Sequence, residues 1–187
     1  MKETTAKKKF MWNMAGSLCN SLSSMLLLII VNRISGESRG GFFALAYSTA
    51  QLLFSVGGFE IRPVQSTDIK NKFTFNQYFT SRMFNCIIML ICMIGYIAVN
   101  GYTGVEALTV FWILGYRMVE AVADVYSGLF QQRERIDISG KEMLMRSGIS
   151  TITFTIILWL TDNLLYAAMT LTLTSLVIML FYDLHMK

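Results

Sequence analysis

The chain of 187 residues is 54% hydrophobic and 15% charged, with a formal net charge of +4 at pH 7. A typical soluble domain carries roughly 25% charged residues, so the composition argues against an ordinary water-soluble domain. Because backbone groups in lipid must be hydrogen-bonded within their own segment, a chain of this kind crosses the bilayer as helices. We therefore predict an all-α, multi-pass integral membrane protein.

Six apolar stretches are each near the roughly 20 residues that a helix needs to cross about 30 Å of hydrocarbon. They cover approximately residues 10–31, 41–59, 83–99, 105–130, 144–160 and 164–181. The fourth stretch is long, so we expect it to tilt or to extend past the membrane on one side. The six predicted helices form a single membrane domain over residues 1–187.

The basic residues are distributed unequally between the connections. If the N-terminus lies on one side, the loops around 60–82 and 131–146 and the C-terminus lie there too. That side holds Lys2, Lys7, Lys8, Lys9, Arg62, Lys70, Lys72, Arg82, Arg133, Arg135, Lys141, Arg146 and Lys187. The opposite side holds Arg33 and Arg39. The positive-inside rule therefore predicts that both termini are cytoplasmic and that the protein lies in the cytoplasmic membrane.

The same basic residues explain the positive net charge without a nucleic-acid partner, because membrane insertion favours them in these positions. The run of Lys7, Lys8 and Lys9 before the first apolar stretch is similar to the start of a signal peptide. That stretch is too long for a signal peptide, and no small-residue cleavage site follows it. We interpret it as a retained first helix.

The residue pairs that enzymes need are missing from the predicted spans. The single histidine, His185, is near the end of the chain, and Asp124 is the one Asp well inside a span. No phosphate-binding, zinc-protease or dinucleotide motif is present. Cys19 and the pair Cys86 and Cys92 have neither metal-site nor disulfide-framework spacing. We predict a protein that is not an enzyme, with no cofactor and no metal.

Polar residues recur at helical spacing in the first two spans. They are Asn13, Ser17, Asn20 and Ser24, with Gly16 beside them, and then Ser48, Gln51, Ser55 and Gly58. Small residues allow helices to pack closely in a membrane, and this interpretation is favoured for the Ser and Gly positions. For Asn20 and Gln51, which are larger and more central, packing and the lining of a cavity remain equally open.

Three charged residues lie inside the fourth apolar stretch. Arg117, Glu120 and Asp124 are separated by three and four residues, which puts them on one face of a helix. They could pair and merely pin this helix to its neighbours. We favour the alternative that they line a cavity, where Arg117 attracts an anion and the carboxylates respond to a proton or sodium. Two carboxylates with one Arg predict a local excess of negative charge.

Two segments carry a family resemblance. In FEIRPVQSTDIKNKFTFNQYFTSR (59–82), an acidic-x-Arg leads to Gln-x-x-Asp, an aromatic stretch, a Tyr and an Arg. These positions are Glu60, Arg62, Gln65, Asp68, Phe73, Phe75, Tyr78 and Arg82. The segment resembles the loop between the second and third helices of bacterial polysaccharide and O-antigen flippases. Residues 116–147, with a charged helix, a Gly-Leu-x-Gln exit, a basic loop and an Arg, also resemble this family.

The resemblance implies the fold of the multidrug/oligosaccharidyl-lipid/polysaccharide exporter superfamily, with two lobes of six or more helices around a central cavity. It implies that an oligosaccharide on undecaprenyl diphosphate is moved across the cytoplasmic membrane by alternating access, for a surface polysaccharide such as lipopolysaccharide or capsule. Besides this lipid-linked oligosaccharide, the implied partners are membrane lipids and a coupling proton or sodium ion. The expected cavity residues are Arg117, Glu120, Asp124, Asn20, Gln51 and Glu60, and the expected loop-ordering residues are Arg62, Asp68 and Arg82.

Six spans make only one lobe of such an exporter. Either the chain is the N-terminal half of a longer or truncated protein, or two copies assemble so that a second copy replaces the second lobe; we favour the first. Two other functions stay open: a cation-coupled small-molecule antiporter of the same superfamily, and a non-transporting scaffold for polysaccharide-synthesis enzymes.

Overall fold

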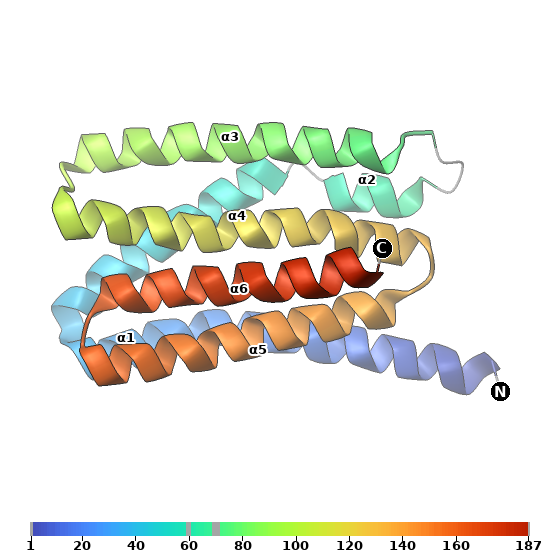
Figure 1. Ribbon diagram of the computed structural model, residues 1–187, viewed down its shortest axis with the longest axis horizontal. Coiled ribbons are helices and arrows are strands. Elements are labelled where there is room, and N and C mark those ends of the chain that lie inside the picture. The colour runs from blue at the N-terminus through green and yellow to red at the C-terminus, as the bar shows by residue number, and fades with distance from the viewer. Residues whose placement is uncertain (1, 59–60, 69–71, 187) are drawn as a thin grey trace.

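All regular elements in the described part of the chain are α-helices (Figure 1). The computed structural model describes residues 2–58, 61–68 and 72–186, with side chains for 6–55, 61–68 and 72–182. The helices are α1 (Lys2–Gly58), α2 (Ile61–Thr67), α3 (Phe75–Asn100), α4 (Gly104–Gln132), α5 (Ile136–Thr161) and α6 (Leu164–Met186). The predicted all-α class is confirmed.

Helix α1 consists of two arms joined by a sharp bend. Gly36 is the one non-helical residue within it, with φ 82° and ψ 172°, a conformation that glycine adopts at little cost because it has no Cβ. From the bend, the first arm (2–35) and the second arm (37–58) both run back toward the opposite end of the molecule and diverge, and the second arm ends well before that end (Figure 1). The two arms correspond to the first two predicted spans, and the predicted connection over 33–40 is reduced to a bend at Gly36.

Within the described residues, four helices are long and apolar enough to cross a membrane. They are residues 6–55 of α1, all of α3, all of α5, and residues 164–182 of α6. Many large apolar side chains on these helices face outward, such as Leu52, Ile91 and Trp159, as expected where lipid rather than water is the solvent. The architecture is therefore that of a helical membrane protein.

Helix α4 is the central helix of the bundle, because it contacts all five of the others. Most of its residues from Thr109 to Phe130 are buried. An apolar core that includes Leu27, Phe43, Ile113 and Phe154 surrounds its first half. This central position explains how α4 carries charged residues: they face protein rather than hydrocarbon.

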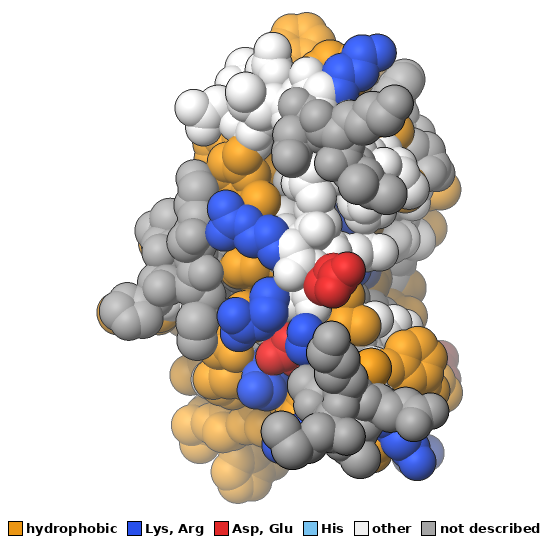
Figure 2. Space-filling model, turned by 90° about the vertical axis from the view of Figure 1, so that its right-hand side faces the viewer, with side chains coloured by type: hydrophobic (Ala, Val, Ile, Leu, Met, Phe, Trp, Pro, Cys, Tyr) orange, Lys and Arg blue, Asp and Glu red, His pale blue; other side chains and the backbone are white. Residues whose placement is uncertain are grey.

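The connections gather at the two ends of the bundle as the basic residues predict. The start of α1, helix α2, the α4–α5 connection and the end of α6 lie at one end, which we call the basic end (Figure 1). The bend of α1 and the α3–α4 and α5–α6 connections lie at the opposite end. Seen from the basic end, Lys and Arg side chains cluster around a small number of acidic ones (Figure 2).

Two glycines allow α1 and α5 to cross at backbone contact. A Cβ placed on Gly16 would overlap the carbonyl group of Gly140, and a Cβ on Gly140 would overlap the backbone of Trp12 and Asn13. Such close approach is possible only when neither helix carries a side chain at the crossing. Gly16 therefore has a packing role, as favoured from the sequence.

Candidate functional site

The charged face of α4 is buried and paired. The guanidinium of Arg117 donates from Nη1 to Oε2 of Glu120, one turn further along, and both side chains are more than 90% buried. On the first arm of α1, Asn20 donates from Nδ2 to the other carboxylate oxygen of Glu120 at 2.8 Å. Three of the residues proposed from the sequence for a cavity are thus in direct contact.

Arg117 also stacks on an aromatic ring of the second arm of α1. Its guanidinium carbon lies 4.4 Å from the ring centroid of Tyr47, within the range of a cation–π contact. The hydroxyl of Tyr47 donates to Ser24 of the first arm at 3.0 Å. The two arms of α1 and the charged face of α4 are therefore joined in one network. Tyr47 was not among the residues predicted for the site, because an aromatic residue in an apolar stretch does not stand out as polar.

Asp124 holds two arginines from two other helices. Its Oδ1 accepts from Nη1 of Arg62 on α2 at 3.1 Å, and its Oδ2 accepts from Nη2 of Arg82 on α3 at 2.9 Å. The Arg82 side chain is only 1% exposed, whereas that of Arg62 is 27% exposed. The sequence assigned both arginines to loop ordering. The structure brings their charged groups into the same cluster as Glu120.

A second buried ion pair lies on α5, where Nε of Arg146 donates to Oε1 of Glu142 at 2.6 Å. Both side chains are at most 2% exposed. Neither was among the predicted site residues, because the fifth span was expected to start near residue 144 and Arg146 to open it. Helix α5 instead begins at Ile136, so Arg146 lies well inside it. The pair could have been recognised from the sequence, because Glu142 and Arg146 are four residues apart next to an apolar stretch, the spacing of an ion pair on one helix face.

These groups border a polar cavity of about 180 Å³. Both arms of α1 and helices α2, α4 and α5 contribute to it. The lining residues are Asn20, Phe54, Arg62, Glu120, Asp124, Ser127, Met143 and Arg146. Ligand sites for whole small molecules usually have at least about 300 Å³. This cavity is therefore the size of a subsite for one polar group.

The sign of the cluster's charge differs from the prediction. Four arginines (Arg62, Arg82, Arg117 and Arg146) meet three carboxylates (Glu120, Asp124 and Glu142) among the described residues. Four minus three leaves one positive charge. The expected negative excess is therefore not found among the described residues, because three arginines from α2, α3 and α5 lie against the carboxylates of α4 and α5. Glu60, the other carboxylate proposed for the cavity, lies outside these residues.

The other two residues proposed for the cavity are Gln51 and Glu60. Gln51 is half-buried on the second arm, its backbone carbonyl accepts from Ser55 at 3.0 Å, and its side chain is not part of the cavity lining. Glu60 lies outside the described residues. Gln65, in contrast, is fully buried, and its side chain lies directly against Gly128 of α4.

Asp68 organises the start of α3 from outside the bundle core. Its carboxylate accepts from the backbone N–H groups of Lys72 at 2.9 Å and Phe73 at 3.0 Å, and from the hydroxyl of Tyr78 at 3.0 Å. Its backbone carbonyl accepts from Gln132 of α4 at 2.7 Å. The amides of Phe73 and Lys72 are the main reason that the pKa of Asp68 is lowered. These contacts support the loop-ordering role proposed from the sequence, which stays a prediction.

We expect the order around Asp68 to be lost in acid. A carboxyl group whose pKa is lowered by folding adds stability above its unfolded pKa of 3.8, and this stability disappears as the pH falls through the folded pKa. At pH 7, Asp68→Asn should therefore speed hydrogen exchange at the Phe73 amide. Exchange followed by mass spectrometry in lipid nanodiscs measures this, with the Ala98 region of α3 as an internal reference. Unchanged exchange in the variant would contradict the role of Asp68.

The chemistry available at the cavity is ionic recognition and hydrogen bonding. Among the described residues, Nη1 of Arg146 and Nε of Arg117 are buried without a hydrogen-bond partner. Guanidinium groups bind phosphate and carboxylate oxygens through several parallel N–H bonds. Comparisons of the chain with protein-family models, with curated proteins and with solved structures found no match.

Proposed function

We propose that this chain is one lobe of a transporter that flips an oligosaccharide linked to undecaprenyl diphosphate across the cytoplasmic membrane. The observation that carries the proposal is the buried cluster of four arginines and three carboxylates beside a polar cavity, at the centre of an apolar helical bundle. Ionisable groups inside a membrane are costly and mark pathways for polar substrates or ions.

The family resemblance supports the proposal in a second way. The two segments that resemble polysaccharide flippases, 59–82 and 116–147, are separate in the sequence. In the structure, Arg62 and Arg82 of the first segment bind Asp124 of the second, and Gln132 binds the carbonyl of Asp68. The two segments that resemble the family are therefore in direct contact in the structure, which supports the proposal.

In this mechanism, the arginines receive the diphosphate and the oligosaccharide lies outside the small cavity. A cavity of about 180 Å³ accommodates a phosphate group but not several sugars. Both arms of α1 contribute to the lining of the cavity, so in this mechanism the lipid-linked substrate approaches along them. A second lobe, on the same chain or on a second copy, would complete the passage.

Coupling to an ion would act through Asp124. A proton or sodium ion at this carboxylate competes with Arg62 and Arg82 for its oxygens. Release of the partly exposed Arg62 would loosen α2 from α4, while Arg82 stays buried. The basic end faces the cytoplasm in this proposal, since cytoplasmic segments carry an excess of Lys and Arg.

The test is the fate of lipid-linked oligosaccharide in cells depleted of this protein. We expect undecaprenyl-linked repeat units to accumulate on the cytoplasmic leaflet and surface polysaccharide to fall. Re-expression of the natural protein should restore export. Arg117→Ala should restore less than about a tenth of it, since loss of one charge-assisted contact of roughly 1.5–3 kcal/mol corresponds to a factor of 10 or more.

Arg33→Ala is the matched control, because Arg33 is an exposed residue near the bend of α1, away from the cavity. It should restore export fully at equal protein level. Full export by well-expressed Arg117→Ala and Glu120→Ala variants would reject the cavity assignment. Unchanged polysaccharide after depletion would reject the flippase, and altered drug sensitivity in the same cells would then favour the antiporter.

A further inference from the structure

A second cleft lies at the end of the bundle opposite the basic end. It has a volume of about 350 Å³ and is formed where the bend of α1, the start of α4 and the α5–α6 connection meet. The lining residues are Ser38, Arg39, Phe42, Val105, Glu106, Thr109, Asp162, Asn163, Leu164 and Leu165. One part of the lining is charged and another is apolar, so the cleft suits an amphipathic group.

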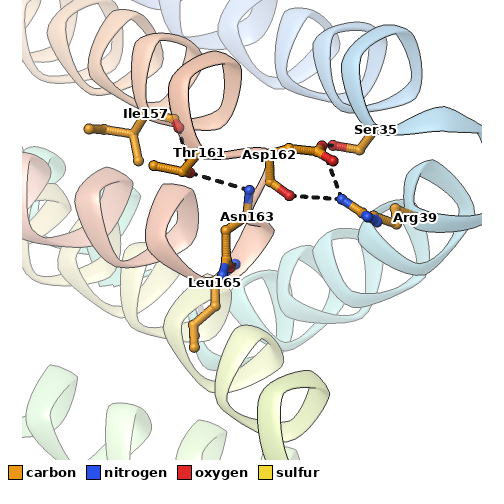
Figure 3. A network of polar contacts seen from close by, with 7 residues as sticks. All are labelled: Ser35, Arg39, Ile157, Thr161, Asp162, Asn163 and Leu165. Atoms are coloured by element: carbon orange, nitrogen blue, oxygen red, sulfur yellow. Dashed lines mark hydrogen bonds and ion pairs between the residues drawn. The ribbon is translucent and has the colours of Figure 1, made fainter.

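The charged side of the cleft is held in place by the contacts drawn in Figure 3. Arg39 donates from Nη1 to the backbone carbonyl of Asp162 at 2.8 Å and forms an ion pair with its carboxylate at 3.0 Å. Ser35 donates to the same carboxylate at 3.3 Å. The backbone of Asp162 has a φ of 45°, a value that residues other than glycine adopt rarely. The side chains of Arg39 and Asp162 are both more than half exposed, so these contacts orient the Asp162 carboxylate at the rim of the cleft.

Glu106 supplies a second carboxylate to the lining. It is exposed in the first turn of α4, and no ion pair to it is found within the described residues. One arginine and two carboxylates give the lining a net charge of −1. Because only Nη1 of Arg39 is engaged by Asp162, its Nε and Nη2 remain available to an anion. The cleft thus offers carboxylates for a cation and guanidinium N–H groups for an adjacent anion.

The apolar side of the cleft consists of Phe42, Val105, Leu164 and Leu165. The ring of Phe42 packs edge-on against Tyr102 at a centroid distance of 5.4 Å, so it forms a fixed wall. Leu164 and Leu165 begin α6, and Phe42 lies just past the bend of α1; both helices carry apolar stretches long enough to span a membrane, so the cleft lies near the end of these stretches. At that depth the neighbouring molecules are lipid head groups and the first carbons of their acyl chains.

We propose that this cleft binds the head group of a phospholipid with a primary ammonium group, such as phosphatidylethanolamine. The ammonium group binds Glu106 and Asp162, the phosphate accepts from Arg39 and the first backbone N–H groups of α4, and the glycerol and first methylene groups lie on the apolar wall. The net negative lining disfavours an anionic lipid such as phosphatidylglycerol. The proposal does not depend on the transport function.

Native mass spectrometry of the purified full chain in mixed micelles tests this, with phosphatidylethanolamine and phosphatidylglycerol supplied at equal concentration. We expect phosphatidylethanolamine to be retained about five-fold more, as fits one or two partly exposed charge contacts. Glu106→Gln should abolish this preference. Glu37→Gln should keep it, because Glu37 is an exposed carboxylate near the same end that lines a different groove.

Both variants must first show the melting temperature of the natural protein, which is expected because both side chains are exposed. Equal retention of the two lipids by the natural protein would overturn the proposal. So would a preference for phosphatidylethanolamine that is the same in Glu106→Gln and Glu37→Gln. Soluble phosphoethanolamine at the same concentration should not displace the lipid, since it lacks the parts that contact the apolar wall. Displacement by it would overturn the assignment to a lipid.

Discussion

Replacement of Gly140 by Ala is expected to lower the free energy of unfolding by about 3 kcal/mol, which is the upper part of the range for overpacking. The new Cβ would lie 2.5 Å from the backbone N and Cα of Asn13. A side chain could rotate away from such a contact, but a backbone cannot. The first arm of α1 would have to move off α5 over the closest part of the most extensive helix–helix contact in the bundle.

Chemical unfolding in mixed micelles, followed by tryptophan fluorescence, measures this loss, because Trp12 lies at the crossing. Gly95→Ala on α3 is the matched control, since no atom lies within 4 Å of the position its Cβ would occupy. That control should change the stability little or raise it slightly, because Ala favours helix. A Gly140→Ala protein as stable as the control would show that the crossing is not in backbone contact.

Replacement of Asp124 by Ala is expected to cost about 3–5 kcal/mol, the range for removing one partner of a buried ion pair. The variant leaves the 1% exposed guanidinium of Arg82 without the carboxylate that it contacts at 2.9 Å. Arg62→Ala should cost only about 1 kcal/mol or less, because the Arg62 side chain is partly exposed and water can replace its contact.

A double-mutant cycle separates the two arginines. Asp124→Ala combined with Arg82→Met should be less destabilising than the sum of the single changes, by about 2 kcal/mol, because the buried cation is removed with its partner. The cycle with Arg62→Ala should give a coupling of well under 1 kcal/mol. Unfolding in the same mixed micelles provides all the values. Additive losses for Asp124 and Arg82 would mean that their ion pair does not stabilise the fold.

Part of the charged site could be predicted from the sequence. The offsets of three and four between Arg117, Glu120 and Asp124 placed them on one face of a helix. In the structure they lie along one face of α4, where Arg117 and Glu120 are buried and Asp124 is partly exposed. The apolar stretches gave the approximate positions of the long helices. The differences are that α3 and α5 begin about eight residues earlier than expected, at Phe75 and Ile136, that α2 lies within a predicted connection, and that the first two spans are arms of one bent helix. Helical periodicity is a local property, so sequence spacing is enough to recover it.

The partners of these charges were decided by the tertiary structure. From the sequence, Arg62 and Arg82 were expected to order a loop and Arg146 to open a helix, and Tyr47 was given no role. All four residues contact or border the charged cluster in the structure. The sign of its charge changed for the same reason. By itself, the sequence determined the helical membrane class, the apolar stretches and the charged face of α4, because each depends on residues within a few turns of one helix. The packing of the helices decided which distant side chains reach that face, since contacts between separate helices depend on crossings such as that of Gly16 and Gly140, which no local spacing specifies.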